Sequence, residues 1–229
     1  MTTNTGTSTS GYDLVGTAAD RCIRRLQYGY RADRPSAVAT VARLRRGVGR
    51  PAYDLQDLWG LTGTEELALV VAESASDPSQ RPDEVRADEA LHLAITLWAL
   101  HQQSHRDTDT HVRGYGLGRS VRLLTASGAV APEAGATPQA RAAAEPEIDE
   151  AVRRRFVRVG TASTLDVLAQ RLREIVLLLR KDAIPLDYAL LADQLYRWQR
   201  PSTQATVRRT WGRDFHTAGV VPATRPPQD

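Results

Sequence analysis

The sequence has little of several residue types, and each shortage excludes a class of protein. Cys22 is the only cysteine in 229 residues, which excludes an intrachain disulfide framework and a zinc site built from cysteines. No apolar run approaches the roughly 18 residues that a transmembrane helix requires. Residues 1–10 carry neither the basic start nor the apolar stretch of a secretory signal. We therefore expect a soluble, cytoplasmic protein.

Lysine is almost absent as well. Of 30 basic residues only Lys181 is a lysine, and the others are arginines. There are 27 acidic residues, so the net charge is +3 and the isoelectric point is about 9.3. A GC-rich genome would favour arginine over lysine, but it would not produce an excess of base over acid. This mild excess permits a polyanionic partner without requiring one.

The apolar pattern is helical almost throughout. Alternating strand patterns with hairpin turns are missing, whereas apolar residues recur every three or four positions. The sequence predicts an all-α protein of two small helical bundles joined by an Ala/Pro-rich linker. The expected parts are a disordered leader (1–11), an N-terminal bundle (12–128), the linker (129–147), a C-terminal four-helix bundle (148–217) and a flexible tail (218–229).

Within these parts the pattern predicts individual helices. The segment 85–105 is apolar on all sides, as expected of a helix in the centre of a bundle. Thr64 is a candidate N-cap, and Pro185 and Pro201 are expected to open the last two helices. The remaining expectations are helices at about 13–30, 35–47, 64–76, 117–127, 148–159 and 164–181, with a short piece near 54–59.

Catalytic motifs are weak in this sequence. No G-x-x-x-x-G-K-[ST] phosphate loop is present, and Cys22 lies among apolar helix residues as an inert buried thiol would. His101 and His105 are four residues apart, a spacing that can bind a metal, but Gln102 stands where a catalytic glutamate would be needed. We expect no enzyme activity, cofactor or metal, and a metal-dependent enzyme using these two histidines remains an alternative.

The arginines form a more informative pattern. On the 117–127 helix Arg119 and Arg122 lie opposite an apolar face formed by Leu117, Val121 and Leu124. Some arginines are expected to pair with carboxylates, as Arg197 with the aspartate four residues before it. The others suit phosphate oxygens, which a guanidinium binds with two hydrogen bonds. From this pattern the predicted nucleic-acid-binding residues are Arg45, Arg46, Arg119, Arg122, Arg158 and Arg200.

A second alternative is a free-standing helix-turn-helix regulator that uses residues 186–215. Trp198, Trp211 and Phe215 are expected to face the core there, and no helix shows a run of residues that reads base edges. Such a regulator would bind its operator without any other protein.

Four segments follow one another along the chain: GYGLGRSVRLLTASG, RRRFVRVGTASTLDVLAQRLREIVLLLR, LDYALLADQLYRW and VRRTWGRDF. In this order they resemble the CasB family, the small subunits of the type I-E CRISPR surveillance complex Cascade. The resemblance implies an all-helical, non-catalytic protein with no membrane contact. Its implied partners are guide RNA, target and non-target DNA strands, other Cascade subunits and a second copy in a head-to-tail dimer. Arg45, Arg46, Arg86, Arg119 and Arg200 match basic positions of the family, which implies a role in stabilising the R-loop.

Overall fold

In the computed structural model the described residues, 11–74, 81–127 and 149–218, form helices and no strand. This confirms the all-α prediction. No helix of these residues is long and apolar enough to cross a membrane. The α-helices are α1 (Leu14–Arg31), α2 (Pro35–Arg45), α3 (Thr64–Glu73), α4 (Glu84–Gln102), α5 (Leu117–Ser127), α7 (Glu150–Gly160), α8 (Leu165–Lys181), α9 (Tyr188–Trp198) and α10 (Pro201–Thr217), with 3₁₀ turns η1 (Ala52–Asp54) and η2 (Gln56–Leu58).

Helix α4 lies in the interior, as its sequence predicts. Both of its apolar sides are buried, and α1, α2, α8 and α9 pack around it. The helix ends at Gln102 rather than 105, because the chain turns at Ser104, whose φ is 72°. Such a left-handed backbone conformation cannot continue a right-handed helix.

Two predicted helix starts are wrong, in each case because of a local backbone feature. Gly63, not Thr64, is the N-cap of α3, and its φ of 84° suits glycine. Pro185 does not open α9, because Leu186 forms a β-bridge with His111 and its N–H donates to the carbonyl of Thr110 at 2.9 Å. Helix α9 starts after Asp187, whose carboxylate accepts a hydrogen bond from the N–H of Leu190.

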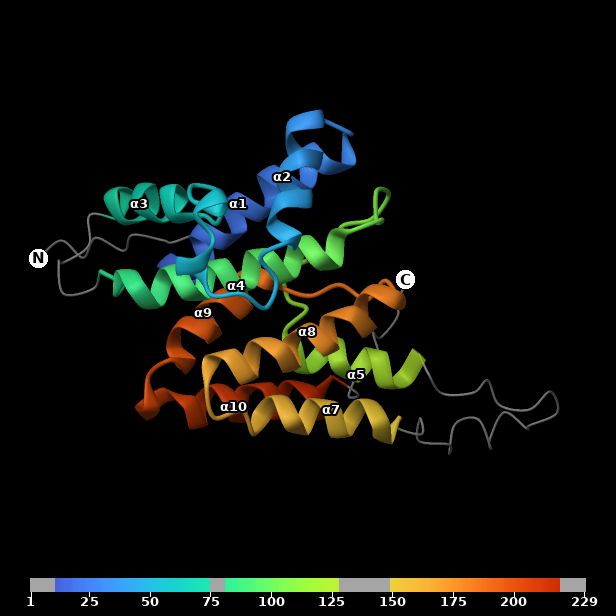
Figure 1. The fold of residues 1–229 in the computed structure, drawn as a ribbon. Helices are drawn as coiled ribbons and strands as arrows, with labels where there is room; N and C mark the ends of the chain where they lie inside the picture. Colours follow the sequence, from blue (N-terminus) through green and yellow to red (C-terminus); the bar gives the residue numbers. More distant parts are fainter. Residues whose placement is uncertain (1–10, 75–80, 128–148, 219–229) are drawn as a thin grey trace, which may run out of the picture.

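The helices group in space differently from their order along the chain. Helices α1–α4 lie together, α5, α7, α8 and α10 lie together, and α9 contacts both α1 and α4 on one side and α10 on the other (Figure 1). Helix α5 was predicted in the N-terminal bundle, yet it packs mainly on α10. One cluster of buried side chains runs from Val15 to Phe215 across both groups. The predicted linker, and all but the edge residues of the predicted leader and tail, lie outside the described residues, so the domain boundaries stay a prediction.

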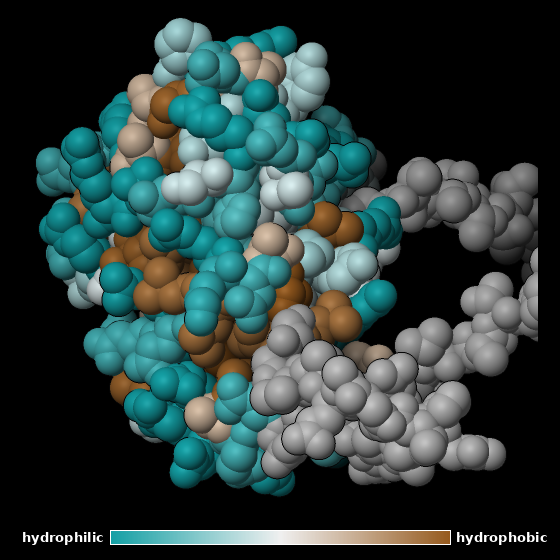
Figure 2. Space-filling model, turned by 90° about the vertical axis from the view of Figure 1, so that its right-hand side faces the viewer, coloured by the Kyte–Doolittle hydropathy of each residue, from teal (hydrophilic) through white to brown (hydrophobic). Residues whose placement is uncertain are grey.

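Two buried aspartates connect these groups. Asp193 on α9 accepts hydrogen bonds from the backbone N–H groups of Gly16 (2.6 Å) and Asp13 (2.8 Å) at the start of α1. Asp187 accepts from the Tyr12 hydroxyl at 3.0 Å and from the N–H of Gly114 at 2.8 Å. These bonds hold the start of α1 and the segment before α5 against α9. On the face in Figure 2, hydrophilic residues surround hydrophobic side chains near the middle.

Candidate nucleic-acid interface

Helix α5 presents its two predicted arginines on aromatic rings. Leu117, Val121 and Leu124 are buried, as predicted. The guanidinium carbon of Arg119 lies 4.3 Å from the centre of the Tyr115 ring, and that of Arg122 lies 5.7 Å from the Phe215 ring. A ring under a guanidinium orients it without neutralising its charge.

Arg119 has one further contact, in which its Nη1 donates to the carbonyl of Gly114 at 3.2 Å. Within the described residues neither Arg119 nor Arg122 has a carboxylate oxygen within 4.0 Å. Arg119 therefore keeps its other N–H donors available for an anion, and so does Arg122, which is half-buried.

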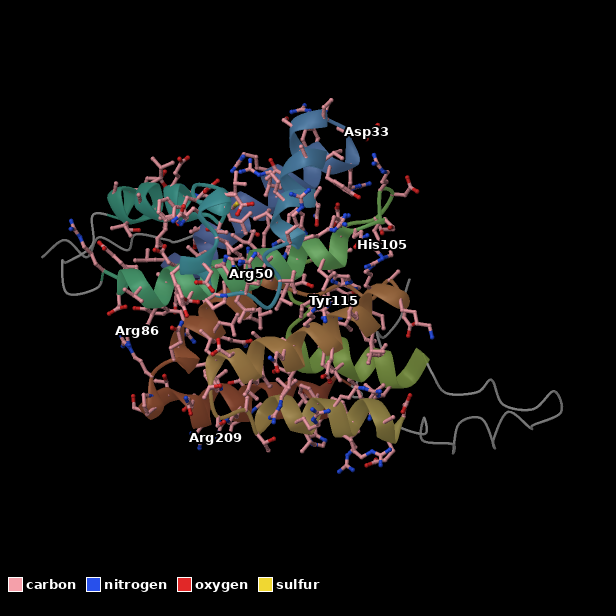
Figure 3. The ribbon with its side chains drawn as sticks, in the orientation of Figure 1. Asp33, Arg50, Arg86, His105, Tyr115 and Arg209 are labelled. Atoms are coloured by element: carbon pink, nitrogen blue, oxygen red, sulfur yellow. The ribbon has the colours of Figure 1, made fainter. Side chains whose placement is uncertain are left out.

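Arg86 and Arg200 are brought together by the fold. They come from the first turn of α4 and from the junction of α9 and α10, and each guanidinium carbon lies 5.7 Å from the centre of the same Tyr196 ring. Arg86 also pairs with Asp83 at 3.2 Å, whereas Arg200 is exposed and has no carboxylate within 4.0 Å among the described residues. Their separation of 114 positions in the sequence hides this arrangement. Arg86 and Arg209 are labelled in Figure 3.

Arg45 and Arg46 lie at the C-terminal end of α2, where Arg46 is exposed and Arg45 is half-buried. Neither has a carboxylate within 4.0 Å in the described part of the chain. Their neighbour Arg43 instead donates to the backbone carbonyl of Asp57, which holds η2 against α2. A backbone carbonyl is a neutral acceptor, so this end of α2 keeps its positive charge.

Helix α7 carries its arginines on an exposed face. Arg158, the residue predicted to bind, lies 3.7 Å from Glu174 of α8, and Arg153 lies 3.2 Å from Glu150. Arg154 and Arg155 are exposed and have no carboxylate within 4.0 Å among the described residues. The sequence could not separate paired from unpaired arginines in this run, because Glu174 comes from another helix.

The arginines of α9 and α10 have mixed roles. Arg208 of α10 donates to the carbonyl of Ala162 at 2.6 Å and lies over the Trp198 ring. It therefore connects α10 with α9 and with the segment between α7 and α8. Arg197 was predicted to pair with Asp193, but it pairs with Asp13, because Asp193 is buried under α1. Arg209 and Arg213 are exposed and unpaired with carboxylates in the described residues.

The histidines of the alternative metal site bind protein groups. His101 is buried, and its Nδ1 lies 2.8 Å from the hydroxyl of Tyr188. His105 Nε2 lies 3.0 Å from the carbonyl oxygen of Arg180. Burial lowers the pKa of His101 to about 3. No group of three or more potential metal ligands occurs in the described ranges.

The remaining two sequence predictions concern buried side chains. Cys22 is fully buried, as predicted, and burial raises the pKa of its thiol to about 12, which favours an inert thiol. In the candidate helix-turn-helix, Trp198, Trp211 and Phe215 are buried as expected. The indole N–H of Trp211 donates to the side-chain oxygen of Gln194 on α9 at 2.6 Å, so α9 and α10 pack against one another through their buried faces.

A family model and one solved structure indicate the family of this chain. The model of the family "CRISPR-associated protein Cse2" matches residues 40–216. The crystal structure of CasB from Thermobifida fusca is 47% identical, with a TM-score of 0.70, covering 90% of this chain and 99% of that chain. A chain of a structure described as a CRISPR RNA-guided surveillance complex, 22% identical, shares the fold with a TM-score of 0.56, covering 89% of this chain and 94% of its own. No curated protein matches the sequence. By the extent of the family match and the identity to CasB, the chain belongs to the CRISPR-associated Cse2 family.

Proposed function

We propose that this chain is the non-catalytic small subunit of a type I-E CRISPR RNA-guided surveillance complex. In this role its surface arginines bind the sugar–phosphate backbone and stabilise the R-loop between guide RNA and target DNA, together with the displaced strand. Its partners are then the guide RNA, both DNA strands, the other subunits of the complex and a second copy of itself. The complex acts in the cytoplasm against invading DNA. Family membership supports the general role.

One structural observation carries the nucleic-acid part of the proposal: several exposed or half-buried arginines have no carboxylate beside them to balance their positive charge. Arg45, Arg46, Arg119, Arg122 and Arg200 have no carboxylate within 4.0 Å among the described residues. Three of the five lie over aromatic rings. A guanidinium that is already oriented loses less side-chain entropy when it binds a phosphate.

The energetics of R-loop formation explain why such contacts are enough. The RNA–DNA duplex formed is about as stable as the DNA duplex it replaces, so modest contacts with the backbone shift the balance. Contacts with phosphates do not read the base sequence. A subunit with this chemistry can therefore act on any target that the guide RNA selects.

A double substitution on α5 tests this function. We expect Arg119→Ala with Arg122→Ala to weaken binding of target DNA by the reconstituted complex. The slope of log affinity against log salt should become shallower by roughly 1.4, about 0.7 for each lost contact with a single strand. Affinity is measured by filter binding or fluorescence anisotropy at several salt concentrations.

A matched control is available on α1. Arg21 and Arg25 are also exposed, but each is paired with a glutamate, Glu73 and Glu66, at 2.6 Å. Arg21→Ala with Arg25→Ala should leave the affinity and its salt slope unchanged. Equal affinity of the α5 variant and the wild type at every salt concentration would remove Arg119 and Arg122 from the interface.

A further inference from the structure

The most exposed large apolar side chains of the described residues gather around one cavity. Tyr53 is 72% exposed, Trp59 70% and Val85 73%. All three line a cavity of about 460 Å³ between the η1–η2 segment and the start of α4. The other three tryptophans are at most 2% exposed. Exposed aromatic side chains around a hollow are typical of protein–protein contacts.

The walls of this cavity are anchored to the core. Leu55, the residue between η1 and η2, and Leu58, the last residue of η2, are both buried. The hydrogen bond from Arg43 to the carbonyl of Asp57 holds the same segment against α2. His92, which also lines the cavity, lies with its Nε2 3.0 Å from the carbonyl oxygen of Arg50. Trp59 and Tyr53 are therefore held outward by a fixed frame.

The charge of the cavity is opposite to that of the arginine surfaces. Asp88 and Glu89 of α4 line it, and no arginine does, although the chain is rich in arginine. Among the described residues neither carboxylate has a basic group within 4.0 Å; Asp88 accepts a hydrogen bond from the Thr64 hydroxyl at 3.2 Å. Burial, with the nearby charges of Asp166 and Asp88, raises the pKa of Glu89. Burial lowers the pKa of His92, which therefore adds no positive charge near neutral pH.

We propose that this cavity, which we call the Trp59 cavity, docks an arginine set among apolar residues on a different protein subunit of the complex. The guanidinium would lie between the carboxylates of Asp88 and Glu89 and the face of Trp59, the aromatic ring that attracts cations most strongly. The neighbouring apolar side chains of the partner would cover Tyr53 and Val85. Phosphate groups are repelled by the two carboxylates, which separates this surface from the arginine surfaces. That this partner is a subunit of the surveillance complex rests on the proposed function.

Co-purification tests the proposal. The chain is expressed with the other subunits of its complex and a guide RNA, and the complex is isolated through a tag on another subunit. We expect Trp59→Ala to lower the amount of this chain in the complex at least tenfold, and Glu89→Gln to lower it several-fold. Leu69→Ala, at a 59% exposed position on α3 outside the cavity, is the matched control and should have no effect.

The outcomes separate this inference from the proposed function. Because Trp59 is exposed, its loss removes no core packing, and an unchanged melting temperature of the isolated variant confirms that it folds. Full incorporation of the Trp59→Ala variant overturns the cavity proposal and leaves the proposed function standing. A wild-type chain that does not enter the complex overturns the proposed function, and with it this partner.

A cross-link then identifies what occupies the cavity. A photoreactive amino acid is placed at Tyr53, the complex is irradiated, and the products are mapped by mass spectrometry. We expect a link to an arginine-containing peptide of another subunit. A link to RNA or DNA, a link to a second copy of this chain, or no link at all would each overturn the proposal.

Discussion

Replacing Gly118 by alanine should force α5 away from α10, the helix on which it mainly packs. A Cβ atom at this position would lie 2.2 Å from the carbonyl oxygen of Trp211, 2.5 Å from the backbone nitrogen of Phe215 and 2.8 Å from the Cβ of Asp214. Two of these are backbone atoms, which cannot rotate out of the way. Favourable contacts need about 3.5 Å, so the helices must separate by roughly 1 Å at this point.

The size of the effect follows from two opposing contributions. Overpacking of a tight contact costs about 1–3 kcal/mol of the free energy of unfolding, and the cost is at the upper end where backbone atoms clash. Alanine recovers at most about 1 kcal/mol through its helix propensity, and less here because Gly118 is the second residue of α5. A net loss of about 2 kcal/mol lowers the Tm of a protein of this size by roughly 4–8 °C.

Gly212 provides the matched control for this measurement. It lies inside α10, and a Cβ atom there meets no heavy atom within 4 Å. Gly212→Ala should therefore raise the free energy of unfolding by up to about 1 kcal/mol, and the Tm by roughly 2–4 °C. Both variants are compared by thermal and urea unfolding. A Gly118→Ala variant as stable as the wild type, or shifts of the same sign in both variants, would refute the packing of α5 on α10.

Two further predictions concern buried titratable groups. Burial, with Asp13 nearby, raises the pKa of Asp193 from 3.8 to about 7, against the hydrogen bonds from Gly16 and Asp13 and the charge of Arg197. The native state then keeps a proton that the unfolded chain releases, so this group's contribution to stability is complete below pH 4 and is lost as the pH rises to about 7. The free energy of unfolding is measured by urea unfolding at pH 5 and at pH 8. Asp193→Asn should change the difference between these two free energies, because it removes the titrating carboxyl group. The same difference in the variant and the wild type would contradict the prediction. Cys22, with a pKa of about 12, should react with iodoacetamide at pH 8 at least 100-fold more slowly in the native protein than in urea. Equal rates would show that the thiol is accessible.

The sequence was a good guide to local structure. The three- and four-residue spacing predicted the positions of the helices and their buried faces, including both apolar sides of α4 and the inner face of α5. It also placed Cys22, Trp198 and Trp211 inside. Helix ends were less predictable, because Gly63 and the Leu186 bridge depend on backbone geometry that neighbouring segments impose.

The candidate site was predictable only in part. Arg119 and Arg122 were recognisable because an amphipathic helix leaves its polar face to solvent. The pairing of Arg158 with Glu174 and the meeting of Arg86 and Arg200 on Tyr196 were not, because each joins different helices. The acidic Trp59 cavity was hidden for the same reason: its walls come from the η1–η2 segment and from α4.

The sequence by itself therefore determined which segments are helical, which side of each is buried and that arginine supplies the surface charge. These properties depend on residues within two turns of one another. The tertiary structure alone decided that α5 packs on α10 and which arginines lie next to a carboxylate. It also decided where carboxylates gather beside an exposed tryptophan. Those properties depend on which apolar faces meet, and many pairings of such faces bury similar areas, so the periodic pattern cannot select among them.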